Sequence, residues 1–245
     1  MPAVTSKPPN LRREGELLGD GPTLLVGADE VGRGALGGPV SAGVVLIDSV
    51  HRRPPRGLRD SKLLTPARRE SLVPRILDWA LASAVGHASA AEIDALGILA
   101  ALRLAGERAI ATLPVEPDVV LLDGNYDWLS RPPRAAASPL AAAPRRVVLQ
   151  VKADLTCASS SAASVLAKVE RDALMVGLAE HHPGYGWEQN KGYATPEHLA
   201  ALGALGPCVE HRRSWRLPGA QGEQLELLAL GDAELAYEVV ESLPA

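Results

Sequence analysis

Residues 23–47 constrain the fold more than any other part of the chain. They read TLLVGADEVGRGALGGPVSAGVVLI, in which two apolar runs rich in β-branched residues lie on either side of a glycine-rich segment. This pattern predicts two paired strands joined by a turn. Further strand-like runs occur at 83–88, 117–124 and 146–154, and the last of these ends at Asp154.

Helix signals alternate with the strand-like runs. The Thr-Pro pair at 65–66 is a typical helix start, and Pro74 should break or kink that helix. SAAE at 89–92 is a capping box, which predicts a long helix extending toward Leu113. ASSSAAS at 158–164 opens another long helix. The alternation of strands and helices predicts an α/β fold, a mixed β-sheet flanked by helices.

The glycines at 32–37 fit the pattern G-x-G-x-x-G, so a dinucleotide-binding loop is one interpretation. That loop requires a helix directly after the glycines, with its N-terminus facing the pyrophosphate. Residues 38–47 are typical of a strand instead. Asp48 also comes too early to be the ribose-binding acid, which is expected about 20 residues beyond the glycines. We conclude that the spacing is a coincidence.

Four acids follow apolar strand-like runs and are themselves followed by glycine or polar turn residues. They are Asp29, Glu30, Asp123 and Asp154. If these strands are neighbours, their ends place four carboxylates around one point, where they would repel one another without a cation. Hard divalent ions such as Mg²⁺ take oxygen ligands and also accept phosphate oxygens. Two such ions about 4 Å apart can activate a water and stabilise the leaving oxygen of a phosphodiester.

The alternative for each single acid is a turn-forming role at a strand end, where Asp is common. Glu30 fits this alternative less well. Neighbouring strand residues point to opposite faces of a sheet. Asp29 and Glu30 can therefore belong to one site only if the regular strand is interrupted there. Gly32 and Gly34 supply such a break.

The charge distribution permits a nucleic-acid partner although the net charge is −4. Residues 221–245 contain six acids and no Lys or Arg, so the rest of the chain keeps 23 of the 29 acids and all 25 basic residues. This body is slightly basic and can bind nucleic acid through local patches.

The chain shows no sign of secretion or of a membrane span. The two cysteines, Cys157 and Cys208, lack metal-ligand spacing and imply no disulfide framework. No run approaches the ~18 apolar residues of a membrane span, and the polar start is unlike a signal peptide. We expect a cytoplasmic protein without membrane contact.

GADEVGRGALGGPV, which begins at Gly27, closely resembles the opening signature of ribonuclease HII, the type 2 ribonuclease H. The resemblance extends over roughly residues 24–216. Six further segments match the family in order: DSK at 60–62, EIDALGILAA at 92–101, LLDGN at 121–125, VKADLTCASSSAASVLAKVERD at 151–172, KGYATPEH at 191–198 and HRRSW at 211–215.

The resemblance implies a ribonuclease H-like fold with a small helical C-terminal part from about residue 190. We expect a flexible N-terminal arm at 1–20, a catalytic domain at 21–218 and an acidic C-terminal tail at 219–245. The implied enzyme is a monomeric endonuclease that hydrolyses the RNA strand of RNA/DNA hybrids. It also nicks duplex DNA 5′ of embedded single ribonucleotides, leaving 5′-phosphate and 3′-hydroxyl ends, which suits ribonucleotide removal from DNA.

The family's metal-binding and catalytic acids match Asp29, Glu30, Asp123 and Asp154. The implied ions are Mg²⁺ or Mn²⁺, as a two-metal site when substrate is bound. Three positions depart from the residues usual in the family: Ala153 replaces glycine, Asn190 replaces histidine and Gly97 replaces asparagine. They affect local loop geometry, and none of them removes a carboxylate.

An enzyme that distinguishes RNA from DNA at one sugar must contact the 2′-hydroxyl. The turn Gly32-Arg33-Gly34 can bring backbone groups close, and Arg33 can meet a phosphate. Tyr193 resembles the family's junction tyrosine, whose ring packs on a deoxyribose while its hydroxyl reaches the ribose hydroxyl; the alternative is a half-buried core tyrosine. Contacts to backbone phosphates, which position the duplex, are expected from Ser61, Lys62, Ser164 and Lys168.

Other basic residues and the tail are less specific. Arg171 could belong to a structural ion pair, and Arg212 could extend the basic surface. QLELLAL, from Gln224, is similar to the motif by which bacterial replication proteins dock on the sliding clamp, so Gln224 and Leu225 indicate a clamp contact. The alternative is an amphipathic helix that covers the body.

Two other functions stay open. One is a non-catalytic module that binds hybrids, and the other is a different metal-dependent nuclease or transposase-like enzyme on the same fold. The four carboxylates argue against pure binding, because a binding module would not place an anionic cluster beside phosphates.

Overall fold

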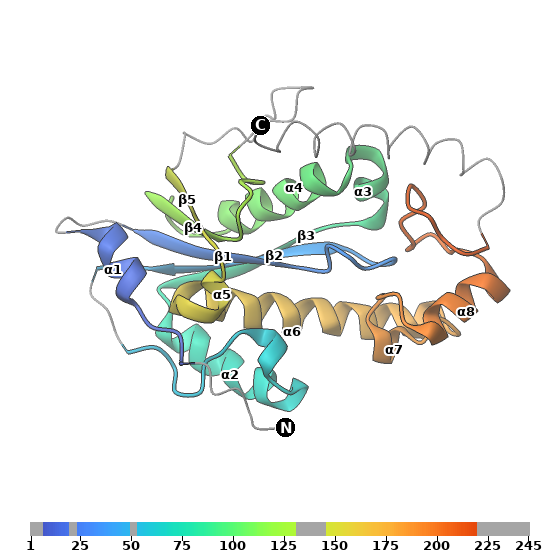
Figure 1. Cartoon of the computed structure of the whole chain (residues 1–245), viewed down its shortest axis with the longest axis horizontal. Coiled ribbons are helices and arrows are strands. Elements are labelled where there is room, and N and C mark those ends of the chain that lie inside the picture. The colour runs from blue at the N-terminus through green and yellow to red at the C-terminus, as the bar shows by residue number, and fades with distance from the viewer. Residues whose placement is uncertain (1–6, 20–23, 50–52, 131–145, 220–245) are drawn as a thin grey trace, which may run out of the picture.

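A mixed five-stranded sheet forms the centre of the protein (Figure 1). The computed structural model describes residues 7–19, 24–49, 53–130 and 146–219. The strands are β1 (Leu25–Val31), β2 (Val40–Ile47), β3 (Ala82–Ala88), β4 (Val119–Asp123) and β5 (Arg146–Gln150), in the spatial order β3-β2-β1-β4-β5. β2 pairs antiparallel with β1 and β3, whereas β1, β4 and β5 are parallel.

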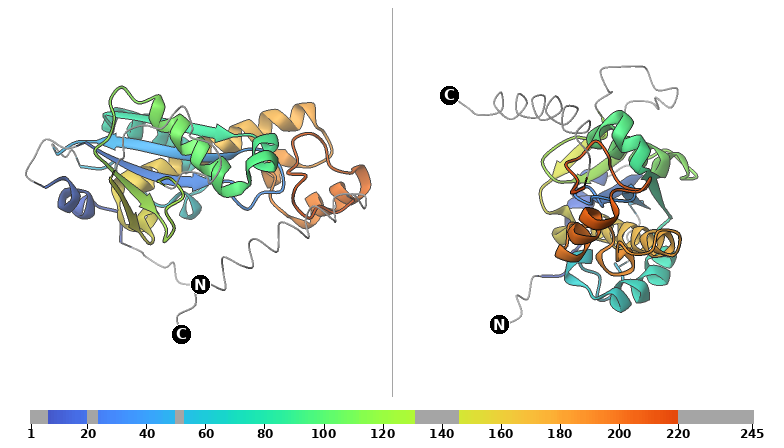
Figure 2. Two further views of the ribbon diagram at one scale, coloured as in Figure 1. Left: turned by 90° about the horizontal axis from the view of Figure 1, so that it is seen from above. Right: turned by 90° about the vertical axis from the view of Figure 1, so that its right-hand side faces the viewer.

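Helices cover both faces of the sheet, so the predicted α/β arrangement is confirmed (Figure 2). α6 packs on β1 and β2 with α2 beside it, and α4 packs on the opposite face. The short helices α7 and α8 form the expected small C-terminal part at one end of the sheet. The helices are α1 (Arg12–Leu18), α2 (Pro66–Trp79), α3 (Ala90–Leu96), α4 (Ile98–Ala111), α5 (Ala153–Thr156), α6 (Ala158–His181), α7 (Trp187–Asn190) and α8 (Pro196–Leu205), with a 3₁₀ turn η1 (Ser61–Leu63).

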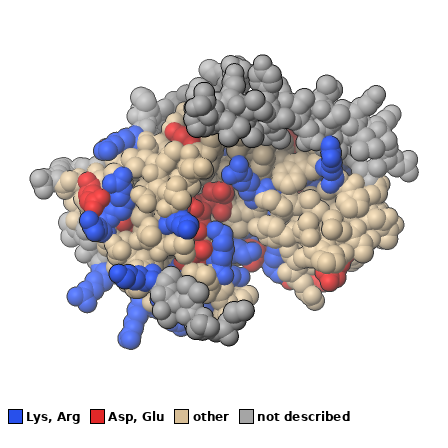
Figure 3. All heavy atoms as spheres, in the orientation of Figure 1, with Lys and Arg blue, Asp and Glu red and all other residues tan. Residues whose placement is uncertain are grey.

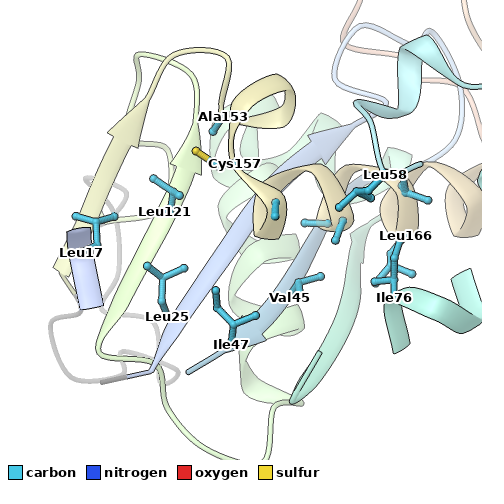
Figure 4. Packing of buried hydrophobic residues seen from close by; sticks show 14 of the residues in the cluster. Leu17, Leu25, Val45, Ile47, Leu58, Ile76, Leu121, Ala153, Cys157 and Leu166 are labelled. Atoms are coloured by element: carbon cyan, nitrogen blue, oxygen red, sulfur yellow. The ribbon is translucent and has the colours of Figure 1, made fainter. Parts of the chain in front are cut away.

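Alternate residues of β1 enter two separate cores, as a strand buried on both faces requires. Leu25 packs with Val45 and Leu121 in the core under α6 (Figure 4), whereas Val26 packs in the core under α4. α6 approaches β1 closely because Gly27 has no side chain; a Cβ there would lie 2.3 Å from the hydroxyl of the facing α6 serine. This close approach brings polar residues of α6 to the end of β1.

Two local predictions are wrong, and the helix break predicted as one alternative at Pro74 is absent. The helix predicted toward Leu113 is divided into α3 and α4, because Gly97 takes a φ of 77° between them. Pro74 lies inside α2 without ending it, since the carbonyl that it leaves without a donor belongs to the exposed Glu70 and can bond to water. The strand predicted up to Asp154 ends at Gln150, and the chain then turns into α5.

Residues 7–19 do not form the flexible arm predicted for 1–20; residues 1–6 and 20 lie outside the described part. α1 packs on the body through Leu17 and Leu18. The buried Glu14 accepts hydrogen bonds of 2.9 Å from both the backbone N–H and the hydroxyl of Ser159. This carboxylate satisfies an N–H at the start of α6 that no helical carbonyl can reach. The folded domain therefore begins before residue 21.

Within the described residues, no helix is long and apolar enough to cross a membrane.

Candidate active site

The predicted carboxylates lie together at one edge of the sheet. Ala28 of β1 is level with Leu122 of the parallel strand β4, so the next residues, Asp29 and Asp123, are neighbours at the strand ends. Glu30 lies one position further along β1, which continues to Val31. The strand therefore does not break between Asp29 and Glu30 as expected, and the glycine turn begins only at Gly32, after Val31.

Asp154 reaches the same place from a helix. The Asp123 Oδ1 atom accepts a 2.6 Å hydrogen bond from the N–H of Ala153, so this carboxylate caps α5 and fixes the next residue beside it. Lys152 takes the left-handed φ of 61° that turns the chain into α5. Ala153 is fully buried and has no positive φ. Alanine is thus compatible with this turn in place of the family's usual glycine.

The carboxylates interact electrostatically. Burial raises the pKa of Asp29 well above its usual range, the charges of Glu30 and Asp123 raise it further, and a hydrogen bond from Ser164 opposes this shift. Burial also raises the pKa of Glu30 and of Asp123, the latter with a contribution from Asp154. Figure 3 shows acidic side chains at the centre of this face with Lys and Arg around them. A cation would relieve this repulsion.

A lysine supplies the nearest positive charge. Lys62 Nζ lies 3.0 Å from Asp154 Oδ2, although its side chain is 70% exposed. Burial lowers the pKa of Lys62, but the hydrogen bond to Asp154 and the charges of Asp60, Asp154 and Asp29 outweigh it, so the pKa is raised. The sequence predicted a phosphate contact for Lys62. The Asp154 side chain is only 7% exposed, so a phosphate contact requires the ammonium group to leave a half-buried pair.

The donor set suits a hard divalent ion. In the described ranges, no three His, Cys, Asp or Glu side chains form a group that could hold a metal ion as they stand. Mg²⁺, however, usually binds through one or two carboxylates and completes its shell with water and substrate phosphates. Asp29, Glu30, Asp123 and Asp154 offer only oxygen ligands, and they repel one another when charged. These residues therefore fit the expected cation.

The hydroxyls of the two serines predicted to contact phosphates bond to each other. The hydroxyls of Ser61 and Ser164 lie 2.8 Å apart and both side chains are buried. This bond joins η1 to α6 next to Asp29. Lys168 Nζ donates to Asp172 Oδ1 at 2.7 Å and lies 5.5 Å from the centre of the Tyr193 ring.

Two buried arginines hold the glycine turn. Arg212 donates to the carbonyls of Gly32 (2.6 Å), Arg33 (2.8 Å) and Gly38 (3.2 and 3.3 Å). Its side chain is fully buried, so the expectation that it extends the basic surface is wrong. Because these carbonyls point inward to a guanidinium, Arg33 and Gly34 remain exposed toward solvent.

Arg171 links the turn to the segment that carries Tyr193. It donates to the carbonyls of Pro39 (2.8 Å), Gly37 (3.2 Å) and Lys191 (3.0 Å), and its guanidinium lies 5.4 Å from the centre of the Tyr193 ring. Tyr193 is half-buried. The predicted reader of the ribose and the predicted glycine turn are therefore parts of one hydrogen-bonded unit.

Asn190, one of the departures, supports the same unit. Its amide N–H donates to the Tyr185 carbonyl at 2.7 Å, and its Oδ1 accepts from the Gly192 N–H at 2.8 Å. The Gly192 carbonyl in turn accepts from the Leu36 N–H at 2.8 Å.

The roles of Arg171 and Arg212 were not predicted from the sequence. A basic residue in a motif suggests a solvent or phosphate contact, since buried arginines are rare. One signal was available: a glycine-rich turn leaves many backbone carbonyls without strand or helix partners, and buried carbonyls require donors.

Comparisons with known proteins agree with these observations. A family model described as ribonuclease HII matches residues 26–217. Ribonuclease HII of Streptomyces coelicolor is 48% identical over 195 residues, which cover 80% of this chain and 78% of that protein.

Solved structures support the fold. Ribonuclease H2 from Pyrococcus horikoshii has a TM-score of 0.62 and 25% identity, and the match covers 79% of this chain and 94% of that chain. Ribonuclease HII from Archaeoglobus fulgidus, solved in complex with PCNA, has a TM-score of 0.59 and 26% identity over 78% and 93% of the two chains. The expected ribonuclease H-like fold is thus confirmed. The chain belongs to the ribonuclease HII family, endonucleases that cleave the RNA strand of RNA/DNA hybrids.

Proposed function

We propose that the protein is a divalent-metal-dependent nuclease that also nicks duplex DNA 5′ of single embedded ribonucleotides, leaving 5′-phosphate and 3′-hydroxyl ends. The observation that carries this proposal is the convergence of Asp29, Asp123 and Asp154 from β1, β4 and α5. Such activity would serve the removal of ribonucleotides from DNA during replication or repair.

In this proposal Asp29, Glu30, Asp123 and Asp154 hold Mg²⁺ or Mn²⁺. Bound ions of this kind supply an activated water and stabilise charge on the departing 3′-oxygen. The chain's own contribution is to hold the carboxylates side by side and to place the scissile phosphate between them. Lys62 leaves Asp154 and contacts a backbone phosphate, together with Ser61, Ser164 and Lys168.

Recognition of the ribose falls to the glycine turn and Tyr193. Arg212 draws the carbonyls of Gly32 and Arg33 inward, which leaves the outer side of the turn to meet the sugar and lets Arg33 reach a phosphate. Gly34 has open space where a side chain would stand, so the duplex can approach the backbone there. Tyr193 packs beside the ribose–deoxyribose junction and presents its hydroxyl to the 2′-hydroxyl.

A cleavage assay tests the proposal. The substrate is a DNA duplex with one ribonucleotide, incubated with Mg²⁺ or Mn²⁺, and the proteins are wild type, Asp123→Asn and the control Asp78→Asn. Asp78 is an exposed acid near the end of α2. We expect wild type and Asp78→Asn to nick on the 5′ side of the ribonucleotide and Asp123→Asn to lose at least about 100-fold in rate.

Absence of cleavage by wild type, or equal cleavage by all three proteins, would refute the proposal. Binding of the ion has its own readout. Mn²⁺ should raise the melting temperature of wild type more than that of Asp123→Asn, because a ligand that binds only the folded state stabilises it.

We also propose that the C-terminal segment contacts the sliding clamp. The Archaeoglobus relative solved in complex with PCNA supports this partner, and the motif at Gln224 and Leu225 supplies the contact; both residues lie outside the described part of the chain. A pull-down with the clamp should fail for a Gln224→Ala, Leu225→Ala double variant, and equal capture of both proteins would refute the contact.

A further inference from the structure

Two buried histidines lie directly behind the loop that carries Tyr193. His198, on α8, and His211, in the following loop, are both fully buried. Their Nε2 atoms are 3.1 Å apart. None of the roles assigned above uses either imidazole.

The neighbours of the two rings determine where every proton must be. The Tyr193 carbonyl can only accept, and it lies 2.9 Å from His198 Nδ1, so that nitrogen carries a proton. His198 Nε2 is 3.1 Å from the Trp187 Nε1–H, which can only donate, so this nitrogen is the acceptor. The Cys208 backbone N–H donates to His211 Nδ1 at 3.1 Å, and the Cys208 Sγ lies 3.2 Å from the same nitrogen. His211 Nδ1 is therefore the acceptor, and the proton of the neutral ring is on Nε2. This N–H shares the one lone pair of His198 Nε2 with the Trp187 N–H.

We infer that His198 and His211 are positioning residues, whose one-way chain of hydrogen bonds from Cys208 to the Tyr193 carbonyl holds the ribose-reading tyrosine in place. The inference rests on the proposed role of Tyr193. The chain of bonds is complete only when both imidazoles are neutral. A further proton on His198 would lie on Nε2 and face the N–H groups of His211 and Trp187, and a further proton on His211 would lie on Nδ1 and face the Cys208 N–H.

The surroundings favour neutral rings. Burial lowers the pKa of His211 to about 4, with the charges of His198, His182 and Arg213 acting in the same direction. Burial likewise lowers the pKa of His198, against the bond to the Tyr193 carbonyl. The other titratable groups around the pair are Cys208, Glu210 and Tyr185, whose ring centre is 4.6 Å from that of His211.

The first test reads the protons directly and requires no activity. Two-bond ¹H–¹⁵N spectra of the ¹⁵N-histidine-labelled full chain at pH 7 distinguish the two neutral tautomers from imidazolium. We expect the Nδ1–H tautomer for His198 and the Nε2–H tautomer for His211, assigned from the signals lost in His198→Asn and His211→Gln. A charged ring, or the opposite tautomer at either residue, would overturn the inference.

The second test measures the effect on Tyr193 through cleavage of the single-ribonucleotide duplex. For His198→Phe we expect kcat to fall about tenfold with KM changed less than about twofold, because phosphate contacts still supply most of the binding while the geometry at the cleaved bond is lost. In His198→Asn the amide nitrogen stands near the position of Nδ1 and can still donate to the Tyr193 carbonyl. That variant should recover to within about threefold of wild type.

Controls separate the outcomes. His181→Phe changes an exposed histidine at the end of α6 and should leave kcat unchanged. A His198→Phe variant with wild-type kcat, or a His198→Asn variant as slow as His198→Phe, would overturn the positioning role. If wild type itself does not cleave, the proposed function fails, and the spectra still decide whether the chain of hydrogen bonds exists.

Discussion

Replacing Arg212 by methionine tests whether the buried guanidinium holds the glycine turn. Arg212 makes four hydrogen bonds to three backbone carbonyls, those of Gly32, Arg33 and Gly38, and its side chain is 0% exposed. Methionine fills a similar volume but donates no hydrogen bond. The carbonyls of Arg33 and Gly38 would lose these donors, each at a cost of about 1–3 kcal/mol, whereas that of Gly32 would keep the Ala35 N–H at 3.2 Å.

The loss of these hydrogen bonds is partly offset by the removal of a buried charge. Burial, together with the charge of Arg171, lowers the pKa of Arg212 to about 9, which means that burying the charged guanidinium itself opposes folding. We therefore expect a net loss of about 3–4 kcal/mol in the free energy of unfolding. For a domain of this size, that corresponds to a fall in melting temperature of about 6–16 °C.

Urea unfolding followed by far-ultraviolet circular dichroism gives the free energy directly. The matched control is Arg213→Met, because the neighbouring Arg213 has an exposed side chain and should change stability by less than about 0.5 kcal/mol. If Arg212→Met lost no more stability than this control, the argument that buried carbonyls require the guanidinium would be wrong.

Three further variants follow from the same contacts. At pH 7 without metal, Asp29→Asn should raise the melting temperature by a few degrees and abolish cleavage: a raised folded-state pKa means that the charged form opposes folding once the pH exceeds the unfolded value of about 3.9. The gain should shrink as the pH falls toward that value, and a variant that melts lower at pH 7 would contradict it. Gly32→Ala should lose about 2–4 kcal/mol of stability in thermal or urea unfolding, because its φ is +83° and its Cβ would lie 2.0 Å from Arg171 Nε; Gly34→Ala, with open space, is the stability control. Glu14→Ala should cost about 1–3 kcal/mol and speed amide exchange at the start of α6, since the Ser159 N–H loses its partner; unchanged exchange would count against it.

Much of the fold was predictable because its signals are local. Apolar runs with β-branched residues indicated β1, β2 and β4, and the capping box at 89–92 is present as expected. The division at Gly97 and the continuous helix through Pro74 were not predictable. The first depends on the positive φ that Gly97 takes in the folded chain. The second depends on water that can bond to the Glu70 carbonyl.

By itself, the sequence determined that a sheet exists, that carboxylates stand at its strand ends and that these match one enzyme family. Strand alternation, turn glycines and short motifs depend on residues near one another in the chain, so they can be read before folding. Only the tertiary structure decided that Asp154 sits on a helix capped by Asp123 and that Arg212 is buried. It also decided that His198 meets His211. Each of these depends on a hydrogen bond between segments that are far apart in the sequence. A local sequence pattern does not show which polar groups become buried and therefore need such a partner.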